Sequence, residues 1–264
     1  MPSAPELGRG VLHQRAAASR FRLRRYPPSP GLAPFVDFYW VVRWDLRGQA
    51  AYEQAILPHP NVHLAFEPGR TAIYGVPTRL FLRKIEGLGA TLGVRFRPGG
   101  FRPFWTGSIA RLTDQVVPAD RLLGPAGEQA RQVIISDPDD AVLVGRAQTL
   151  LDSVRPARDP VAEEVAAMVA RIVAEPALRQ VGQLAADLDT PVRRLQRLFA
   201  DYVGVSPKWV IRRARLHDAA LRAEQAGPVD WAVLAADLGY SDQAHLTRDF
   251  TAIIGESPAR YAAR

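Results

Sequence analysis

Hydrophobic residues in the first half of the chain occur in short runs that proline and glycine interrupt. The runs are rich in aromatic and β-branched residues, which favour strands, and they cover residues 35–42, 55–57, 62–66, 71–74 and 92–96. Turn residues such as Pro58, Pro60 and Pro98 separate them. Many short strands with such punctuation are typical of a sandwich or barrel. We therefore expect a β-rich domain over residues 26–118, preceded by a basic N-terminal arm over residues 1–25.

From about residue 119 the hydrophobic positions recur every three or four residues, which indicates helices. Asp137-Pro138 and Asp159-Pro160 each offer an N-cap followed by a proline at the first helical position. We expect a short helical connector over residues 119–158 and an all-α domain over residues 159–264. The predicted fold class is therefore a two-domain α+β protein.

The last quarter of the chain contains an internal repeat. The run Leu-Ala-Ala-Asp-Leu at residues 184–188 recurs at residues 234–238. Further matches follow at an offset of 51, namely Leu195 with Leu246, Arg197 with Arg248, Phe199 with Phe250, Gly204 with Gly255, and Ser206-Pro207 with Ser257-Pro258. Because each copy begins with a short helix and continues through a tight turn into a longer helix, it predicts a helix-turn-helix unit.

The two predicted units span residues 181–203 and 231–254. The segment between them runs from Pro207 to Ala226 without an internal proline or glycine. As a helix it is ~30 Å long, close to the ~34 Å between successive major grooves on one face of B-DNA. Such a connector places two recognition helices in adjacent grooves.

The longer helix of each unit presents a polar face with residue types that read base edges. Arginine pairs with guanine and glutamine with adenine in the major groove. The candidate base-reading residues are Arg193, Arg194, Gln196 and Arg197 in the first unit, and Gln243, Ala244, His245, Thr247 and Arg248 in the second. The candidate phosphate contacts are Thr190, Lys208, Arg212 and Ser241.

Residues 161–264 resemble the AraC/XylS family of bacterial regulators. The resemblance is carried by residues 238–250 and 255–261, and by the spacing from Thr190 to Phe199. It implies base contacts by Arg193, Gln196 and Arg197, and a second set around Gln243 to Arg248. Residues 35–40, 56–58, 93–100 and 112–114 resemble the β-rich sensor domains of some such regulators, which implies a cupin-like barrel or sandwich.

Aromatic side chains on the predicted strands are usually core, but a small barrel also encloses ligands. The candidate pocket residues are Trp40, His63 and Tyr74. His59, His63 and Glu67 are spaced by four, a pattern that on a helix would favour metal binding. The prolines around His59 break any helix there, so surface roles are the default and no metal site is predicted.

Composition and charge exclude several classes of function. The chain of 264 residues has a net charge of +7 and no cysteine, which excludes disulfides and thiolate chemistry. Most of the basic surplus lies in the first 110 residues, so overall charge supports DNA binding only weakly. No hydrophobic run approaches the ~20 residues of a membrane span, and we expect a cytoplasmic protein.

The sequence thus predicts a sequence-specific transcription regulator controlled through its N-terminal domain by a small molecule or by dimerisation. We expect no catalytic activity and no cofactor. The candidate partners are double-stranded promoter DNA, a small-molecule effector, a second copy of the chain and RNA polymerase, with no membrane partner. Two alternatives are a ligand-independent architectural DNA binder and a cupin-type metalloenzyme with a DNA-targeting domain.

Overall fold

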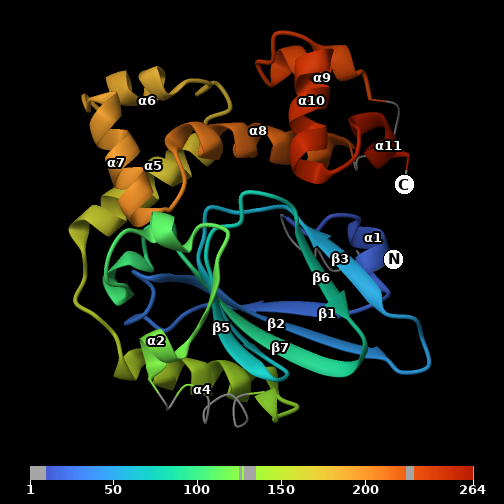
Figure 1. Ribbon diagram of the computed structural model, residues 1–264, viewed down its shortest axis with the longest axis vertical. Coiled ribbons are helices and arrows are strands. Elements are labelled where there is room, and N and C mark those ends of the chain that lie inside the picture. Colours follow the sequence, from blue (N-terminus) through green and yellow to red (C-terminus); the bar gives the residue numbers. More distant parts are fainter. Residues whose placement is uncertain (1–9, 125–126, 128–134, 224–228, 264) are drawn as a thin grey trace.

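The computed structural model describes residues 10–124, 127, 135–223 and 229–263. A β-rich domain forms one half of the molecule and a group of helices forms the other (Figure 1). The β-rich N-terminal region and the helical C-terminal region confirm the predicted two-domain fold class.

A six-stranded antiparallel sheet is the centre of the N-terminal domain. The register is continuous along its longest pair, from Phe38 opposite Arg95 to Leu46 opposite Gly87. In spatial order the strands are β1 (Arg22–Tyr26), β2 (Val36–Leu46), β7 (Gly87–Phe96), β4 (His63–Glu67), β5 (Arg70–Tyr74) and β8 (Val116–Pro118).

A second sheet has two strands, β3 (Tyr52–Ile56) and β6 (Phe81–Ile85). No ladder of hydrogen bonds joins it to the large sheet among the described residues, so the strands are not closed into a barrel. The sequence predicted either a sandwich or a barrel. The described strands form two separate sheets with a cavity between them, and not a closed barrel.

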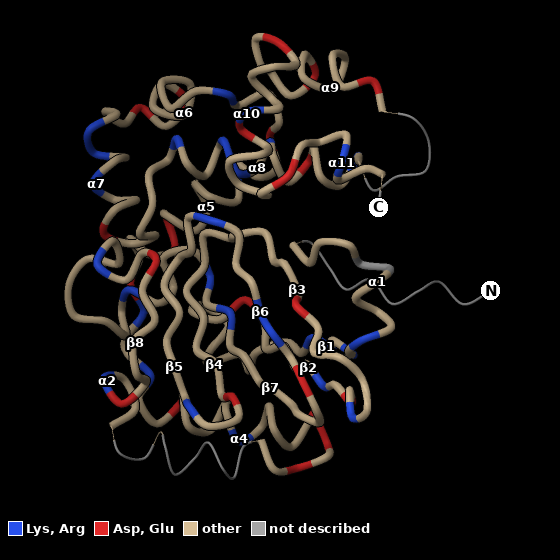
Figure 2. The backbone as a smooth tube through the Cα atoms, turned by 45° about the vertical axis from the view of Figure 1, so that its right-hand side comes forward, with Lys and Arg blue, Asp and Glu red and all other residues tan. Residues whose placement is uncertain are grey.

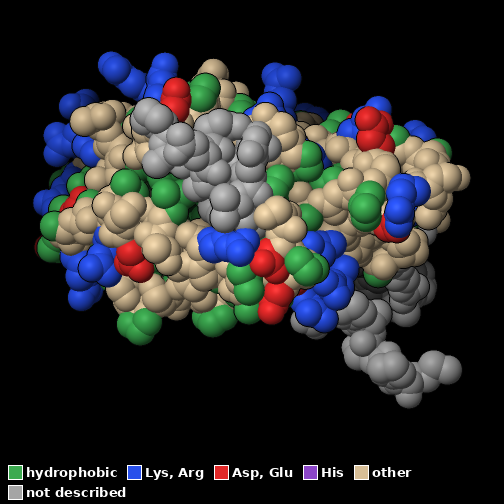
Figure 3. Space-filling view, turned by 90° about the horizontal axis from the view of Figure 1, so that it is seen from below, with side chains coloured by type: hydrophobic (Ala, Val, Ile, Leu, Met, Phe, Trp, Pro, Cys, Tyr) green, Lys and Arg blue, Asp and Glu red, His purple; other side chains and the backbone are tan. Residues whose placement is uncertain are grey.

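The two faces of the large sheet have different neighbours because side chains alternate along each strand. On β2, Tyr39 and Val41 belong to a core that also contains Leu143 and Leu151 of helix α4 (Asp140–Ser153). Phe38, Trp40, Val42 and Trp44, which alternate with them, line the cavity on the side of the small sheet. Seen from the α4 side, hydrophobic side chains are scattered among charged ones (Figure 3).

The N-terminal arm differs from the expectation. Residues 1–9 lie outside the described part, but helix α1 (Gln14–Ala18) is followed by strand β1, which begins at Arg22. Ala17 and Phe21 are buried against Trp44, Leu46 and Ile85. The sheet therefore begins four residues before the predicted boundary, because these few apolar side chains suffice to dock the segment.

Two 3-10 turns, η1 (Arg102–Phe104) and η2 (Ile109–Leu112), lie between β7 and β8. Helices α2 (Asp120–Leu123) and α4 lie between β8 and the C-terminal helices. Helix α4 is capped by Asp139, whose side chain accepts a hydrogen bond from the Ala141 N–H. The predicted cap, Asp137, lies two residues too early.

The C-terminal helices follow the predicted repeat closely. They are α5 (Pro160–Ala174), α6 (Val181–Asp187), α7 (Val192–Tyr202), α8 (Pro207–Ala223), α9 (Trp231–Asp237), α10 (Gln243–Ile254) and α11 (Pro258–Ala262). Helices α6 and α7 form the first helix-turn-helix unit and α9 and α10 the second. In Figure 1, α7 and α10 stand near the two ends of α8 and run in the same general direction.

The two domains share one hydrophobic core. It continues from the large sheet through α4 and α5 to α7 and the first part of α8. Two hydrogen bonds reinforce the contact: the Ser108 hydroxyl donates to the Ala200 carbonyl at 2.9 Å, and the Thr113 hydroxyl donates to the Gly204 carbonyl at 2.6 Å. The C-terminal end of α7 is therefore held by the N-terminal domain, while its first turns are exposed.

Candidate nucleic-acid interface and cavity

Helix α7 is strongly amphipathic, because its hydrophobic residues recur on one face. Leu195 and Phe199 are completely buried, and Leu184 of α6 belongs to the same core. The residues between them therefore point outward. All four predicted base-reading residues of this helix, Arg193, Arg194, Gln196 and Arg197, are exposed.

Helix α10 repeats this arrangement. Leu246 and Phe250 are buried, which leaves Gln243, Ala244 and Arg248 exposed. His245 and Thr247, also predicted to contact DNA, are only half-buried and flank the exposed face. The Asp242 side chain caps the helix by accepting from the His245 N–H at 2.7 Å.

The arginines of the C-terminal domain fall into two groups. One group holds the helices together through a carboxylate or a helix-end carbonyl: Arg171 with Asp187, Arg179 with the Asp237 carbonyl, Arg212 with Asp249, Arg215 with the Gly239 carbonyl, and Arg222 with Asp237. In the other group, the guanidinium groups of Arg193, Arg194, Arg197 and Arg248 form no ion pair or hydrogen bond within the described residues. Figure 2 shows the basic stretch along α7.

An exposed cation without an internal partner has its hydrogen-bonding capacity available for an external anion. The unpaired arginines all lie on the second helix of a helix-turn-helix unit, the helix that enters the major groove in such motifs. The C-terminal domain thus presents its unpaired guanidinium groups on the two recognition helices.

The predicted phosphate contacts differ in their surroundings. Lys208 and Ser241 are exposed, and Thr190 is half-buried with its hydroxyl donating to the Leu188 carbonyl. Arg212 forms an ion pair with Asp249 of α10 at 2.8 Å. This guanidinium therefore ties α8 to the second unit, a role that the sequence pattern could not distinguish from DNA contact.

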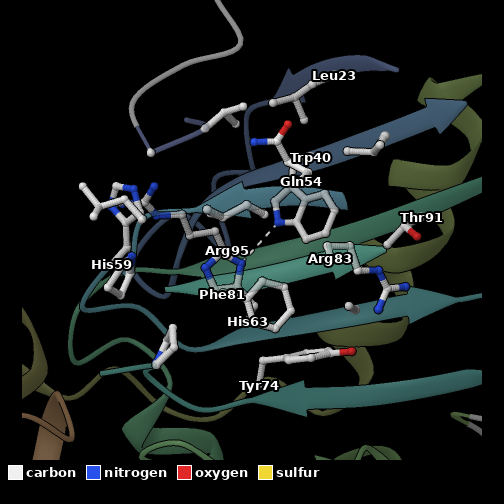
Figure 4. Close-up of a pocket in the computed structure, with 18 of the residues that line it drawn as sticks. Leu23, Trp40, Gln54, His59, His63, Tyr74, Phe81, Arg83, Thr91 and Arg95 are labelled. Carbon is white, nitrogen blue, oxygen red and sulfur yellow. Dashed lines mark hydrogen bonds between the residues drawn. The ribbon is translucent and has the colours of Figure 1, made fainter. Parts of the chain in front are cut away.

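A cavity of about 390 Å³ lies between the two sheets of the N-terminal domain. Trp40, His63 and Tyr74, the three predicted pocket residues, all line it (Figure 4). Its walls are mainly apolar and aromatic, with Phe38 and Phe81 among them. Gly93 permits this shape, because a Cβ there would collide with the Trp40 ring.

One wall carries a buried carboxylate with three partners. Glu67 accepts hydrogen bonds from the Arg70 guanidinium at 2.8 Å and from the Tyr74 hydroxyl at 2.8 Å, and it pairs with Arg83 at 3.1 Å. Desolvation, reinforced by the Glu67 charge, raises the pKa of Tyr74 to about 12. The Glu67 charge is therefore balanced within the protein.

At another part of the wall, His63 and Arg95 lie directly opposite each other on β4 and β7. The Trp40 indole N–H donates to His63 Nδ1 at 3.2 Å. Burial, and to a smaller extent the Arg95 charge, lowers the pKa of His63 to about 3. His63 is therefore neutral near pH 7 and carries its proton on Nε2.

The cavity reaches the C-terminal domain through His59, in the loop between β3 and β4. From α8, Arg213 donates through Nε to the Pro58 carbonyl at 2.7 Å, and its Nη2 lies 2.7 Å from His59 Nδ1. Arg95 approaches the same ring at 3.4 Å. Burial first, and then the neighbouring Arg213, Arg95 and His217, lower the pKa of His59 well below its usual value.

Sequence reasoning did not single out Arg213 and Arg95 for the cavity. Arg213 was only one of several arginines on a helix, and nothing in its spacing revealed that it is buried. Arg95 alternates with buried residues on β7, which was the available signal that it faces the other side of the sheet.

No group of three or more His, Cys, Asp or Glu side chains suited to a metal ion occurs in the described residues. None of the helices in the described ranges is long and apolar enough to cross a membrane.

Comparison with known families identifies the C-terminal domain. A family described as a helix-turn-helix domain matches residues 184–264, and a domain of unknown function (DUF6597) matches residues 24–118. The helix-turn-helix match begins within α6 and covers the rest of the first unit and all of the second. The C-terminal domain is a helix-turn-helix domain of the AraC type, a kind of domain that binds DNA.

Among solved structures, this chain is similar to ToxT from Vibrio cholerae. One crystal form aligns with 92% of this chain and 98% of that chain at 8% identity and a TM-score of 0.40. ToxT from strain O395 aligns with 93% and 98% at 9% identity and a TM-score of 0.38. A form bound to an unsaturated fatty acid aligns with 92% and 91% at 10% identity and a TM-score of 0.37. No curated protein sequence matches the chain significantly.

Proposed function

We propose that the protein is a sequence-specific transcription regulator that reads DNA with α7 and α10 and responds to a small molecule in the inter-sheet cavity. It acts by binding, with no catalytic step. The observation that carries the proposal is the placement of the unpaired arginines Arg193, Arg194, Arg197 and Arg248 on the two recognition helices.

The relative placement of the two units supports a two-part binding site. Arg212 and Arg215 tie α8 to the second unit, and Arg179 joins the segment before α6 to the end of α9. Helix α8 has 17 residues, which corresponds to ~26 Å. A connector fixed at both ends favours a constant spacing between two blocks of bases.

The proposed base contacts are Arg193, Arg194, Gln196 and Arg197 in α7, and Gln243, Ala244, His245, Thr247 and Arg248 in α10. An apolar contact is all that Ala244 offers, so the second helix reads fewer bases. Proposed phosphate contacts are Thr190, Lys208 and Ser241. We leave Arg212 out, since its charge is compensated by Asp249.

Small-molecule control is supported by the continuity between the cavity and α8. His59 lines the cavity and receives Arg213 from the helix that joins the two units. Pro58 and His59 belong to the chain that leads from the small sheet into the large one. A ligand that changes the distance between the sheets therefore moves Pro58 and His59, which contact Arg213 of α8.

Selection of binding sites from random duplexes with the full chain tests the DNA-binding proposal. We expect enrichment of a motif with two blocks separated by about one helical turn, ~10 bp. Binding without any enriched motif would instead identify an architectural DNA binder, because phosphate contacts carry no sequence information. Analytical ultracentrifugation with and without the selected DNA tests the expected dimer, and RNA polymerase recruitment is tested on the same duplex.

A further inference from the structure

We propose that the inter-sheet cavity binds an anionic amphipathic molecule, an aromatic or aliphatic body with one carboxylate, and that His63 and Arg95 hold the carboxylate. This inference rests on the proposed role of the cavity as the effector site. It adds the chemical class of the effector and the two residues that recognise its charged group.

The first observation is a pair of donors that the protein leaves unused. His63 Nδ1 accepts from the Trp40 indole, so the proton is on Nε2, and this N–H has no partner among the described residues. Arg95 donates through Nη2 to the Asn61 side-chain oxygen at 2.9 Å, and its Nε lies 3.3 Å from Asp37, which leaves Nη1 without a described partner. Both side chains line the cavity.

The second observation is their position. His63 and Arg95 are cross-strand partners, so their side chains project from the same face of the large sheet. The Arg95 side chain is only 18% exposed. A neutral N–H and a guanidinium N–H on adjacent strands suit the two oxygens of one carboxylate, and charge-assisted hydrogen bonds of this kind are stronger than neutral ones.

The third observation is the balance of charge. Arg25, Arg79, Arg83 and Arg95 line the cavity, against Glu67 and Asp114. With their ion-paired neighbours Arg70 and Asp37, five arginines meet three carboxylates. The Thr78 hydroxyl and backbone N–H both donate to Asp114, so this carboxylate is already engaged. The positive surplus favours an anion and disfavours an amine.

The rest of the cavity wall favours a ligand whose body is apolar. Phe38, Trp40, Trp44 and Phe81 line the cavity with Leu23 and Ile56, and the apolar side chains outnumber the polar ones. The volume of about 390 Å³ lies in the range of small-molecule sites. A sugar is a poor fit, because its hydroxyls would be desolvated against these rings without partners.

Isothermal titration calorimetry on the full chain tests the proposal with two isosteric series. The probes are biphenyl-4-carboxylate and decanoate, each compared with its neutral amide and its primary amine. We expect at least one acid to bind with a Kd at least tenfold lower than its amide, and the amines to bind more weakly still. No binding of either acid up to 1 mM, or equal affinity for acid and amide, would overturn the proposal.

Variants then locate the carboxylate. Arg95→Gln and His63→Phe should each remove most of the preference for acid over amide, while the amide affinity changes less than threefold. Arg47→Gln is the control in the same domain, because Arg47 is an exposed arginine that pairs with Asp45 and does not line the cavity, and this variant should keep the preference. Should Arg95→Gln fail to fold, judged by its thermal unfolding, His63→Phe carries the test. Retention of the full preference in His63→Phe refutes the assignment.

These measurements do not depend on DNA. If the acids bind as expected but leave DNA affinity unchanged, the effector role fails while the ligand class stands. If DNA binding is specific and no acid binds, the regulator function stands while the ligand class fails.

Discussion

The guanidinium of Arg213 reaches from the helix between the two DNA-binding units to the ring of His59 in the wall of the cavity, with 2.7 Å between Nη2 and Nδ1. Arg213 is buried and His59 is half-buried, and the Pro58 carbonyl accepts a hydrogen bond from the same guanidinium. Within the described residues this contact is a direct polar link from the cavity to α8. Its contribution to the free energy of unfolding is therefore the first quantity to measure.

Replacing Arg213 with Met keeps the aliphatic length and removes the guanidinium. We expect the free energy of unfolding to fall by about 2–3 kcal/mol, because hydrogen bonds from a charged donor are lost and a buried carbonyl loses its partner. Urea denaturation measures the change. Arg222→Met is the control on the same helix, since Arg222 is an exposed ion-pair partner of Asp237 and contributes less than ~1 kcal/mol. Equal effects of the two changes would contradict the interface role.

Removing a base-reading guanidinium should affect specific DNA binding alone. We expect Arg197→Ala and Arg248→Ala each to lower affinity for the selected site by about 1–3 kcal/mol, with stability unchanged. Fluorescence anisotropy against the selected site and a scrambled duplex measures both affinities. Arg155→Ala serves as the charge control, because Arg155 is an exposed arginine paired with Asp152 outside the helix-turn-helix units. A loss that is the same on both duplexes would show phosphate contact without base reading.

The buried histidines predict how stability depends on pH. Burial lowers the pKa of His63 to about 3 and that of His59 well below 6.5. Between these values and 6.5 the unfolded chain binds more protons than the folded one, so stability is fully present above pH 6.5 and is lost as the pH falls. For each histidine the slope approaches ~1.4 kcal/mol per pH unit. Denaturation at pH 7.0, 6.0 and 5.0 measures it.

His63→Phe isolates one of the two contributions. The variant should lose about half of the slope over this pH range, because His59 still titrates. The carboxylates with lowered pKa, such as Asp45 at about 2, act at lower pH and do not interfere. An unchanged slope would mean that His63 is not the titrating group.

Two glycines offer a matched test of the cavity wall. At Gly93 an added Cβ meets the Trp40 ring, so Gly93→Ala should displace Trp40 and cost about 1–3 kcal/mol. At Gly145, within α4, a Cβ meets nothing, so Gly145→Ala should stabilise by about 1 kcal/mol. Thermal unfolding shows whether each change raises or lowers the stability, and tryptophan fluorescence reports the Trp40 environment. Stabilisation by both changes would show that the Trp40 ring is not held against Gly93.

Much of the helical domain was predictable because its signals are local. The repeat of Leu184 and Leu195 in Leu234 and Leu246 defined both units, and the predicted ranges agree with α6, α7, α9 and α10. The exposure of Arg193 and Arg197 followed from helical periodicity alone. The start of α4 was placed two residues early, because Asp137 and Asp139 are equally good caps and only packing selects between them.

The cavity was less predictable because its walls come from strands distant in sequence. Alternation along β2 indicated two faces, but it could not say which face packs on α4 and which faces the small sheet. The three candidates Trp40, His63 and Tyr74 do lie together. Their arginine neighbours were hidden among the many arginines of the N-terminal half.

The sequence alone determined the two helix-turn-helix units, the residues on their outer faces and the β-rich character of the first domain, because helix periodicity, capping and strand propensity act over a few residues. Tertiary structure decided which arginines are free and which hold helices together, since this depends on acids and carbonyls far along the chain. It also brought Arg213 to His59 across 154 positions. Such a contact has no local signature, because burial and geometry are properties of the packed chain.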